Sequence, residues 1–310
     1  MVKYLDLSHS VYLRETPDFS YFPNVEKLIL INCKSLVLVH KSIGILDKKL
    51  VLLNLSSCIE LDVLPEEIYK LKSLESLFLS NCSKLERLDD ALGELESLTT
   101  LLADFTALRE IPSTINQLKK LKRLSLNGCK GLLSDDIDNL YSEKSHSVSL
   151  LRPVSLSGLT YMRILSLGYC NLSDELIPED IGSLSFLRDL DLRGNSFCNL
   201  PTDFATLPNL GELLLSDCSK LQSILSLPRS LLFLDVGKCI MLKRTPDISK
   251  CSALFKLQLN DCISLFEIPG IHNHEYLSFI VLDGCKLAST DTTINTMLEV
   301  RFYCFCFSRI

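Results

Sequence analysis

Apolar residues recur along this chain in a phrase of nine positions, L-x-x-L-x-L-x-x-C, in which x stands for varied and mostly polar residues. The alternation inside the phrase predicts a short strand with one buried face. Ten of the eleven steps between its copies are 21 to 25 residues long, a period typical of leucine-rich repeats. The copies begin at Val2, Val25, Leu50, Leu74, Leu98, Leu121, Met162, Leu187, Leu210, Leu231, Leu254 and Leu277.

The remainder of each repeat has a second pattern, in which apolar residues are spaced by three and a proline often stands at the corner, as from Leu61 through Pro65 to Leu74. This spacing favours a 3₁₀ or irregular turn over a long α-helix. The sequence therefore predicts an α/β repeat solenoid. It is a leucine-rich repeat horseshoe with a parallel β-sheet on its concave face and short helical, 3₁₀ or irregular returns on its convex face.

The period also predicts the domain organisation. Residues 1–287 form one solenoid of about twelve repeats, and the long step from Leu121 to Met162 predicts an inserted loop near residues 131–155. Residues 288–310 continue without another copy of the phrase, which predicts an irregular C-terminal tail. Neither end carries a polar capping segment, so we expect the chain to be part of a larger protein.

Cysteine closes the phrase in most repeats, at one equivalent position of the coil. Equivalent positions on stacked coils have parallel Cβ vectors, which is poor geometry for disulfides. We therefore expect small buried thiols that pack like hydrophobic residues and donate weakly to turn carbonyls. Free thiols in this number indicate a reducing, intracellular compartment. The nine residues are Cys33, Cys58, Cys82, Cys129, Cys170, Cys218, Cys239, Cys262 and Cys285.

Composition narrows the classes of function. The chain has 310 residues and a net charge of −6, which argues against general nucleic-acid binding. It contains no apolar run long enough for a membrane span. The glycine-rich phosphate and dinucleotide motifs are missing, and Cys304-x-Cys306 and His272-x-His274 are isolated pairs rather than zinc-ligand sets. We therefore expect no enzyme activity, no cofactor and no metal.

Binding should involve the strand residues that point away from the core. Two groups of such residues are candidates for partner contact. An apolar stripe in the early repeats consists of Ile29, Ile31, Leu52, Phe78, Leu102 and Phe105, and exposed apolar patches often mark partner surfaces. A basic group on consecutive central repeats, with Asp189 and Asp191 nearby, consists of Lys122, Arg123, Arg163, Arg188 and Arg193. The basic group suits either an acidic partner or a solvated charged face.

Three segments carry a family resemblance. They are LDLSHSVYLRETPDFSYFPNVEKLILINCKSLVLVHKSIG (Leu5 to Gly44), LPEEIYKLKSLESLFLSNCSKLERL (Leu64 to Leu88) and LIPEDIGSLSFLRDLDLRGNSFCNLP (Leu176 to Pro201). They resemble the leucine-rich repeat region of plant TIR-type nucleotide-binding disease-resistance receptors. The resemblance extends over almost all of residues 1–287.

The resemblance implies an intracellular immune receptor whose repeats recognise a pathogen effector or a guarded host protein. It also implies that the repeats restrain the nucleotide-binding domain of the parent receptor, in the cytoplasm and also in the nucleus. The TIR and nucleotide-binding parts of the family do not occur in this sequence, so NAD cleavage and nucleotide exchange are not assigned to it. Two alternatives stay open: an extracellular receptor-like ectodomain, and the substrate-binding repeats of a ubiquitin-ligase receptor.

Overall fold

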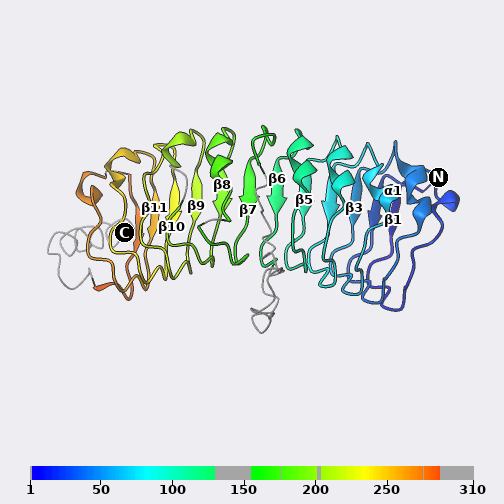
Figure 1. Ribbon diagram of the computed structural model, residues 1–310, viewed down its shortest axis with the longest axis horizontal. Helices are drawn as coiled ribbons and strands as arrows, with labels where there is room; N and C mark the ends of the chain where they lie inside the picture. Colours follow the sequence, from blue (N-terminus) through cyan, green and yellow to red (C-terminus); the bar gives the residue numbers. More distant parts are fainter. Residues whose placement is uncertain (1, 130–154, 175, 201–203, 275, 287–310) are drawn as a thin grey trace, which may run out of the picture.

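The computed structural model describes residues 2–129, 155–174, 176–200, 204–274 and 276–286. Twelve three-residue strands form one open sheet in which every neighbouring pair is parallel and the spatial order follows the sequence (Figure 1). The strands are β1 Tyr4–Asp6, β2 Lys27–Ile29, β3 Leu52–Asn54, β4 Ser76–Phe78, β5 Thr100–Leu102, β6 Arg123–Ser125, β7 Ile164–Ser166, β8 Asp189–Asp191, β9 Glu212–Leu214, β10 Phe233–Asp235, β11 Lys256–Gln258 and β12 Phe279–Val281. The predicted fold class is confirmed.

Register in the sheet follows the repeat without a slip. Leu28 pairs with Leu53, and Leu53 pairs with Leu77 in the next coil. All three side chains are fully buried. A shift by one residue would turn each of these leucines to the opposite face, so burial of the central residue locks the strands in place. The result is a continuous apolar core that runs along the solenoid.

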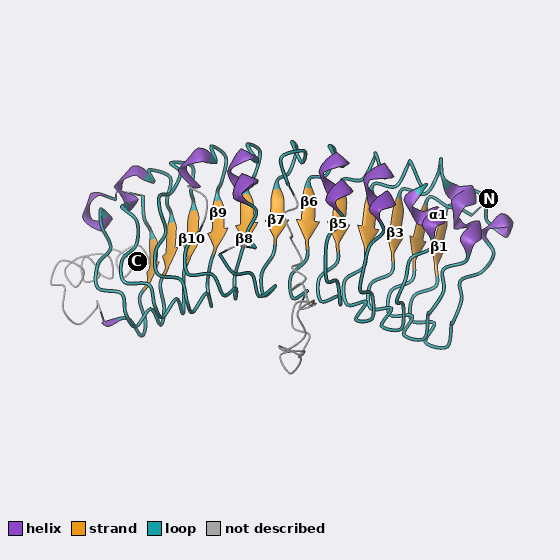
Figure 2. Ribbon diagram, viewed as in Figure 1, coloured by secondary structure: helices purple, strands orange, loops and turns teal. Residues whose placement is uncertain are grey.

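The returns are short, as the spacing of three predicts. One four-residue α-helix occurs among the described residues, and the other helical turns are 3₁₀. In Figure 2 they line the edge of the sheet next to the N-terminal ends of the strands. Their bounds are η1 Phe19–Tyr21, η2 Lys41–Leu46, α1 Glu66–Tyr69, η3 Asp90–Glu94, η4 Ser113–Gln117, η6 Glu179–Ser183, η7 Phe204–Thr206, η8 Ile248–Lys250 and η9 Ile271–Asn273.

Polar caps and corner prolines start these turns. Asp18, Asp89 and Asp247 each accept a hydrogen bond from the backbone N–H two residues further on, which satisfies a donor that the short turn leaves free. Pro65 and Pro112 precede α1 and η4 and supply the fixed φ that suits a helix start.

The row of cysteines forms as predicted. Each of the nine thiols donates to a backbone carbonyl of the preceding coil, as Cys58 does to Leu30 and Cys82 to Leu55, both at 3.2 Å. All nine are free and buried. Burial raises the pKa of Cys58, Cys82, Cys170 and Cys218 to about 12.

A turn that ends at the cysteine position follows every strand. We call it the left-handed turn, because the residue just before the cysteine position has a positive φ. In the second repeat the turn Leu30–Cys33 is closed by the Cys33 N–H, which donates to the Leu30 carbonyl at 3.4 Å, and its third residue, Asn32, has a φ of 60°. The equivalent residue has positive φ in all twelve repeats, including the aromatic residues Phe105 and Tyr169. The fold therefore imposes this conformation whatever the side chain.

Cys251 and His274 are buried at positions where other repeats place leucine. The predicted inserted loop near 131–155 lies, but for its last residue, outside the described residues, and so does the predicted tail 288–310.

Candidate partner-binding surface

Three positions of each repeat face away from the core: the residue before the strand and the first and third strand residues. In β4 the central Leu77 is fully buried, while Ser76 and Phe78 are half-buried on the other face. The central residue is buried in β2 to β11, and the flanking positions make three parallel rows of outward side chains, in which Ser125, Asp191 and Asp235 are themselves buried. Neighbours within a row are about 4.8 Å apart because each row crosses adjacent strands.

The structure separates the predicted apolar stripe into two settings. Ile29, Phe78 and Leu102 lie in the row of third strand residues, where Phe78 pairs directly with Leu102 and Asn54 stands between Ile29 and Phe78. Leu52 lies in the row of first strand residues. These four side chains are half-buried rather than fully exposed, because outward neighbours on adjacent strands pack against one another.

Ile31 and Phe105 lie beyond the ends of β2 and β5, in the turn that follows each strand. Phe105 is the most exposed member of the stripe at 57%. Its ring lies over Gly128 of the next repeat, where an added Cβ would stand 2.5 Å from the Phe105 Cδ1 atom. The stripe therefore extends from the sheet onto the ridge of left-handed turns.

The predicted basic group also divides. Lys122, Arg163 and Arg188 occupy one row, since the Arg163 N–H donates to the Lys122 carbonyl and the Arg188 N–H donates to the Arg163 carbonyl, both at 2.8 Å. Arg123 opens β6 beside them. All four side chains are exposed at the N-terminal ends of β6 to β8.

Arg193 lies at the opposite end of the strands, after β8, and its charge is already neutralised. Its guanidinium donates to both carboxylate oxygens of Asp191, through Nε at 2.9 Å and Nη2 at 2.8 Å. Asp191 is buried although its position faces outward, because Arg193 covers it. Sequence spacing alone placed five cations together, whereas the structure brings four together and pairs the fifth.

A second apolar region lies at the far end of the sheet and was not predicted from the sequence. Leu232 and Phe255 are exposed in the row before the strands, and Phe233 and Phe279 lie in the next row. The rings of Phe255 and Phe279 meet edge to face, with centroids 5.0 Å apart. We call these four residues the aromatic end. Comparison of all three outward positions of each repeat, rather than the middle x of the phrase alone, would have found it.

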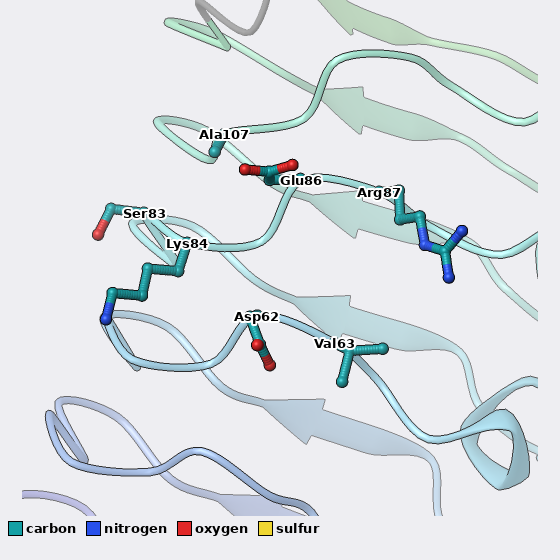
Figure 3. Close-up of a pocket in the computed structure, with 7 residues that line it drawn as sticks. All are labelled: Asp62, Val63, Ser83, Lys84, Glu86, Arg87 and Ala107. Carbon is teal, nitrogen blue, oxygen red and sulfur yellow. The ribbon is translucent and has the colours of Figure 1, made fainter.

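The hollow in Figure 3 holds no convergent set of groups. It has a volume of about 470 Å³ and lies between returns of the early repeats, lined in part by Asp62, Glu86 and Ala107. The Lys84 and Arg87 side chains extend to opposite sides of it (Figure 3). Lys84 pairs with Glu60 at 2.6 Å and Glu86 pairs with Arg109 at 3.1 Å, so these charges neutralise one another instead of facing a ligand.

Other kinds of site also lack support in the part of the chain that the structure describes. No group of three or more His, Cys, Asp or Glu side chains gathers as a metal site there. None of the described helices is long and apolar enough to cross a membrane.

Sequence comparisons identify plant relatives. The TMV resistance protein N of Nicotiana glutinosa is 32% identical over 83% of this chain and 27% of its own length. The disease resistance protein RPP4 of Arabidopsis thaliana is 37% identical over 96% of this chain and 30% of its own length. The chain thus spans less than a third of the length of either relative. No family model matches it.

Structural comparison supports the architecture. An internalin (InlF) from Listeria monocytogenes superimposes with a TM-score of 0.61 over 92% of this chain and 81% of that one, at 18% sequence identity. At that identity the likeness shows the leucine-rich repeat fold and no shared function. The fold, the repeat and the plant relatives agree: over most of its length, this chain is homologous to TIR-type nucleotide-binding leucine-rich repeat disease-resistance proteins.

Proposed function

We propose that this chain is the protein-recognition and regulatory repeat module of an intracellular plant immune receptor. Its concave face binds a pathogen effector or a guarded host protein, and its repeats restrain the nucleotide-binding domain of the parent receptor. The proposal places the module in the cytoplasm and also in the nucleus. The kinship with disease-resistance proteins supports the immune role.

We assign contact with the partner to the apolar stripe and the basic group that were predicted from the sequence. The carrying observation is the adjacent pair Phe78 and Leu102, which face away from the core on neighbouring strands and keep part of their apolar surface in water. Burying such surface against a partner is favourable by about 25 cal/mol per Å². Buried aromatic residues are also the commonest anchors of protein interfaces.

The test is a binding screen followed by a targeted substitution. Purified pathogen effectors and plant host proteins are passed over the immobilised chain, and affinity for the best binder is measured by interferometry. Phe78→Glu with Leu102→Glu should weaken that binding at least tenfold, because two charges would be desolvated at the contact. Urea unfolding should show that the fold is retained.

A matched control places the same chemistry elsewhere. Ile45→Glu with Val63→Glu replaces two exposed apolar residues outside the sheet. This variant should bind normally. The proposal fails if no effector or host protein binds, or if the Phe78 and Leu102 substitutions leave affinity unchanged while the fold persists.

A further inference from the structure

A cluster of cations lies at one border of the concave face, next to the N-terminal ends of β6, β7 and β8. All of its side chains are exposed. They come from three consecutive coils, although the chain as a whole carries a net charge of −6. We call this cluster the basic edge; its members are Lys119, Lys120, Lys122, Arg123, Arg163 and Arg188.

The sheet holds the central members close together. Backbone hydrogen bonds of 2.8 Å join Arg163 to Lys122 and Arg188 to Arg163, so the three side chains leave adjacent strands about 4.8 Å apart. Like charges opposite one another in a sheet are destabilising. Among the described residues, none of the observed ion pairs involves these three side chains. The cluster therefore carries positive charge that no ion pair of the described residues compensates.

The adjacent carboxylate of Asp189 does not reverse this balance. Asp189 follows Arg188 and is half-buried at the start of β8. Burial raises the pKa of Asp189 above its ordinary range, and the charges of Arg188 and Arg123 oppose that rise only in part. Asp189 and its strand neighbour Glu212 supply two negative charges beside six cations, so the local charge stays positive.

Two exposed aromatic rings stand among the cations. Tyr161 and Phe186 stack with ring centroids 5.8 Å apart and an interplanar angle of 29°. They are 53% and 48% exposed, and each precedes an arginine of the basic edge by two residues. Arginine together with aromatic residues is the composition that protein interfaces favour.

We propose that the basic edge and the Tyr161–Phe186 pair bind an acidic segment of a protein partner that also carries apolar or aromatic side chains. The carboxylates pair with the Lys122, Arg163 and Arg188 row, and an apolar side chain packs on the stacked rings. The inference rests on the proposed function, because it names the chemistry of the partner at one part of the concave face.

The surroundings favour a protein over a nucleic acid. Asp189 and the exposed Glu212 border the cations in the row of first strand residues, so the positive surface is short and suits a few carboxylates of a peptide better than a continuous phosphate backbone. Beyond Arg188 the row continues through Gly211 to the apolar Leu232, linked by hydrogen bonds of 2.8 Å. An acidic segment followed by apolar residues therefore matches the order of chemistry along the row.

The experiment uses the full chain and a defined probe. The probe is a fluorescein-labelled ten-residue peptide of alternating glutamate and tyrosine, compared with a glutamine and tyrosine peptide. Anisotropy should show binding of the acidic probe that weakens as salt rises, and much weaker binding of the glutamine probe. Lys122→Glu, Arg163→Glu and Arg188→Glu together should reduce affinity for the acidic probe at least tenfold. Tyr161→Ala with Phe186→Ala should reduce it severalfold.

A matched triple variant separates a site from a general charge effect. Lys34→Glu, Lys220→Glu and Lys243→Glu make the same change of charge at exposed positions away from the strands, and should leave affinity within twofold. An equal loss in both triple variants would overturn the proposal, and so would absence of binding by the unaltered chain. Tighter binding of a single-stranded RNA 20-mer, lost in the basic-edge variant, would also overturn it.

The test is separable from that of the apolar stripe. The Phe78→Glu and Leu102→Glu variant should bind the acidic probe as the unaltered chain does, because those residues lie on β4 and β5. If the Phe78 and Leu102 variant loses partner binding but still binds the acidic probe, the apolar stripe and the basic edge are two separate contacts on one face. If that variant keeps partner binding, and only the basic-edge variant loses the probe, the proposal for the basic edge holds and the one for the apolar stripe fails.

Discussion

At the scale of single residues, the recurring cysteine is suited to a small and dry space. Its thiol is fully buried in most repeats and donates to a carbonyl of the preceding coil, as Cys82 does at 3.2 Å. A buried carbonyl without a donor would cost about 1–3 kcal/mol. Each thiol therefore supports the junction between two coils rather than a redox reaction.

This arrangement predicts the order in which thiols react. In the native chain at pH 8, iodoacetamide should modify Cys198, which is half-buried, before Cys58 or Cys82. Burial keeps iodoacetamide away from the thiols of Cys58 and Cys82 and raises their pKa to about 12, so almost no thiolate is present. Mass spectrometry of each cysteine peptide against time measures the order. Equal rates for Cys82 in native and urea-unfolded protein would contradict it.

Asn195 replaces cysteine in one repeat and makes more contacts than a thiol. Its amide nitrogen donates to the carbonyls of Leu167 at 2.9 Å and Leu192 at 2.8 Å, and its oxygen accepts from the N–H groups of Cys170 and Leu172. Asn195→Ala should lower the free energy of unfolding by about 2–4 kcal/mol, because several buried groups lose their partner.

The thiol variant provides the control for that substitution. Asn195→Cys should cost less than Asn195→Ala, since a thiol can still donate to a carbonyl as in the other repeats. Urea unfolding midpoints measure the ranking. A cost below about 0.5 kcal/mol for Asn195→Ala would show that relaxation or water satisfies these groups.

At the scale of elements, the left-handed turn after each strand couples neighbouring repeats. The Phe105 ring occupies the space above Gly128, and the Tyr169 ring does the same above Gly194, where an added Cβ would stand 2.1 Å from the Tyr169 Cδ1 atom. Tyr169 then donates its hydroxyl to Asp217 at 3.0 Å. An aromatic residue in one turn therefore requires glycine in the next.

A double-mutant cycle tests this coupling. Gly128→Ala should destabilise the chain by about 1–3 kcal/mol, because Gly128 has a φ of 69° and the new Cβ meets the Phe105 ring. In a Phe105→Ala background the same substitution should cost at least about 0.5 kcal/mol less. Urea denaturation of the four proteins measures the coupling.

The control combines Phe105→Ala with Gly194→Ala, because these two residues belong to different ring–glycine contacts. Their effects should add, since the Phe105 ring covers Gly128 rather than Gly194. Additivity in both cycles would disprove contact coupling between the turns.

At the scale of the whole molecule, each coil covers the face of its neighbour. Contacts follow this order, since β3 pairs with β2 and β4 alone and the short returns pack in sequence. A solenoid of this kind tolerates a change in the number of repeats but not in their phase.

Deletion of one whole repeat therefore provides a global test. Removal of residues 74–97 joins Ser73 to Leu98, which occupies the position of Leu74 in the next repeat. The shortened chain should fold with an unchanged circular dichroism spectrum per residue. Its urea m-value should fall by about one part in twelve, because m follows the surface exposed on unfolding.

Deletion of residues 74–85 is the matched control, since it removes half a repeat. It should abolish cooperative unfolding, because the remaining leucines no longer meet a buried position of the next coil. A folded half-repeat variant would contradict the requirement for phase.

Much of the candidate surface could be predicted from the sequence, because strand alternation determines which residues face outward. Phe78, Leu102, Arg163 and Arg188 all lie on that face. Whether a partner binds them stays a prediction. Arg193 could not be told from the other cations by sequence, because its pairing with Asp191 depends on how the chain turns after β8.

The sequence by itself determined the solenoid, its register and its row of thiols, because a period of 21 to 25 residues permits only one way to bury every leucine. The tertiary structure alone decided which outward side chains meet. Tyr161 and Phe186 are 25 positions apart in the chain yet stack at 5.8 Å, and the aromatic end gathers residues from three consecutive repeats. The stacking of the coils determines which side chains are neighbours across strands. The pattern within one repeat does not specify which residues the next repeat places beside it.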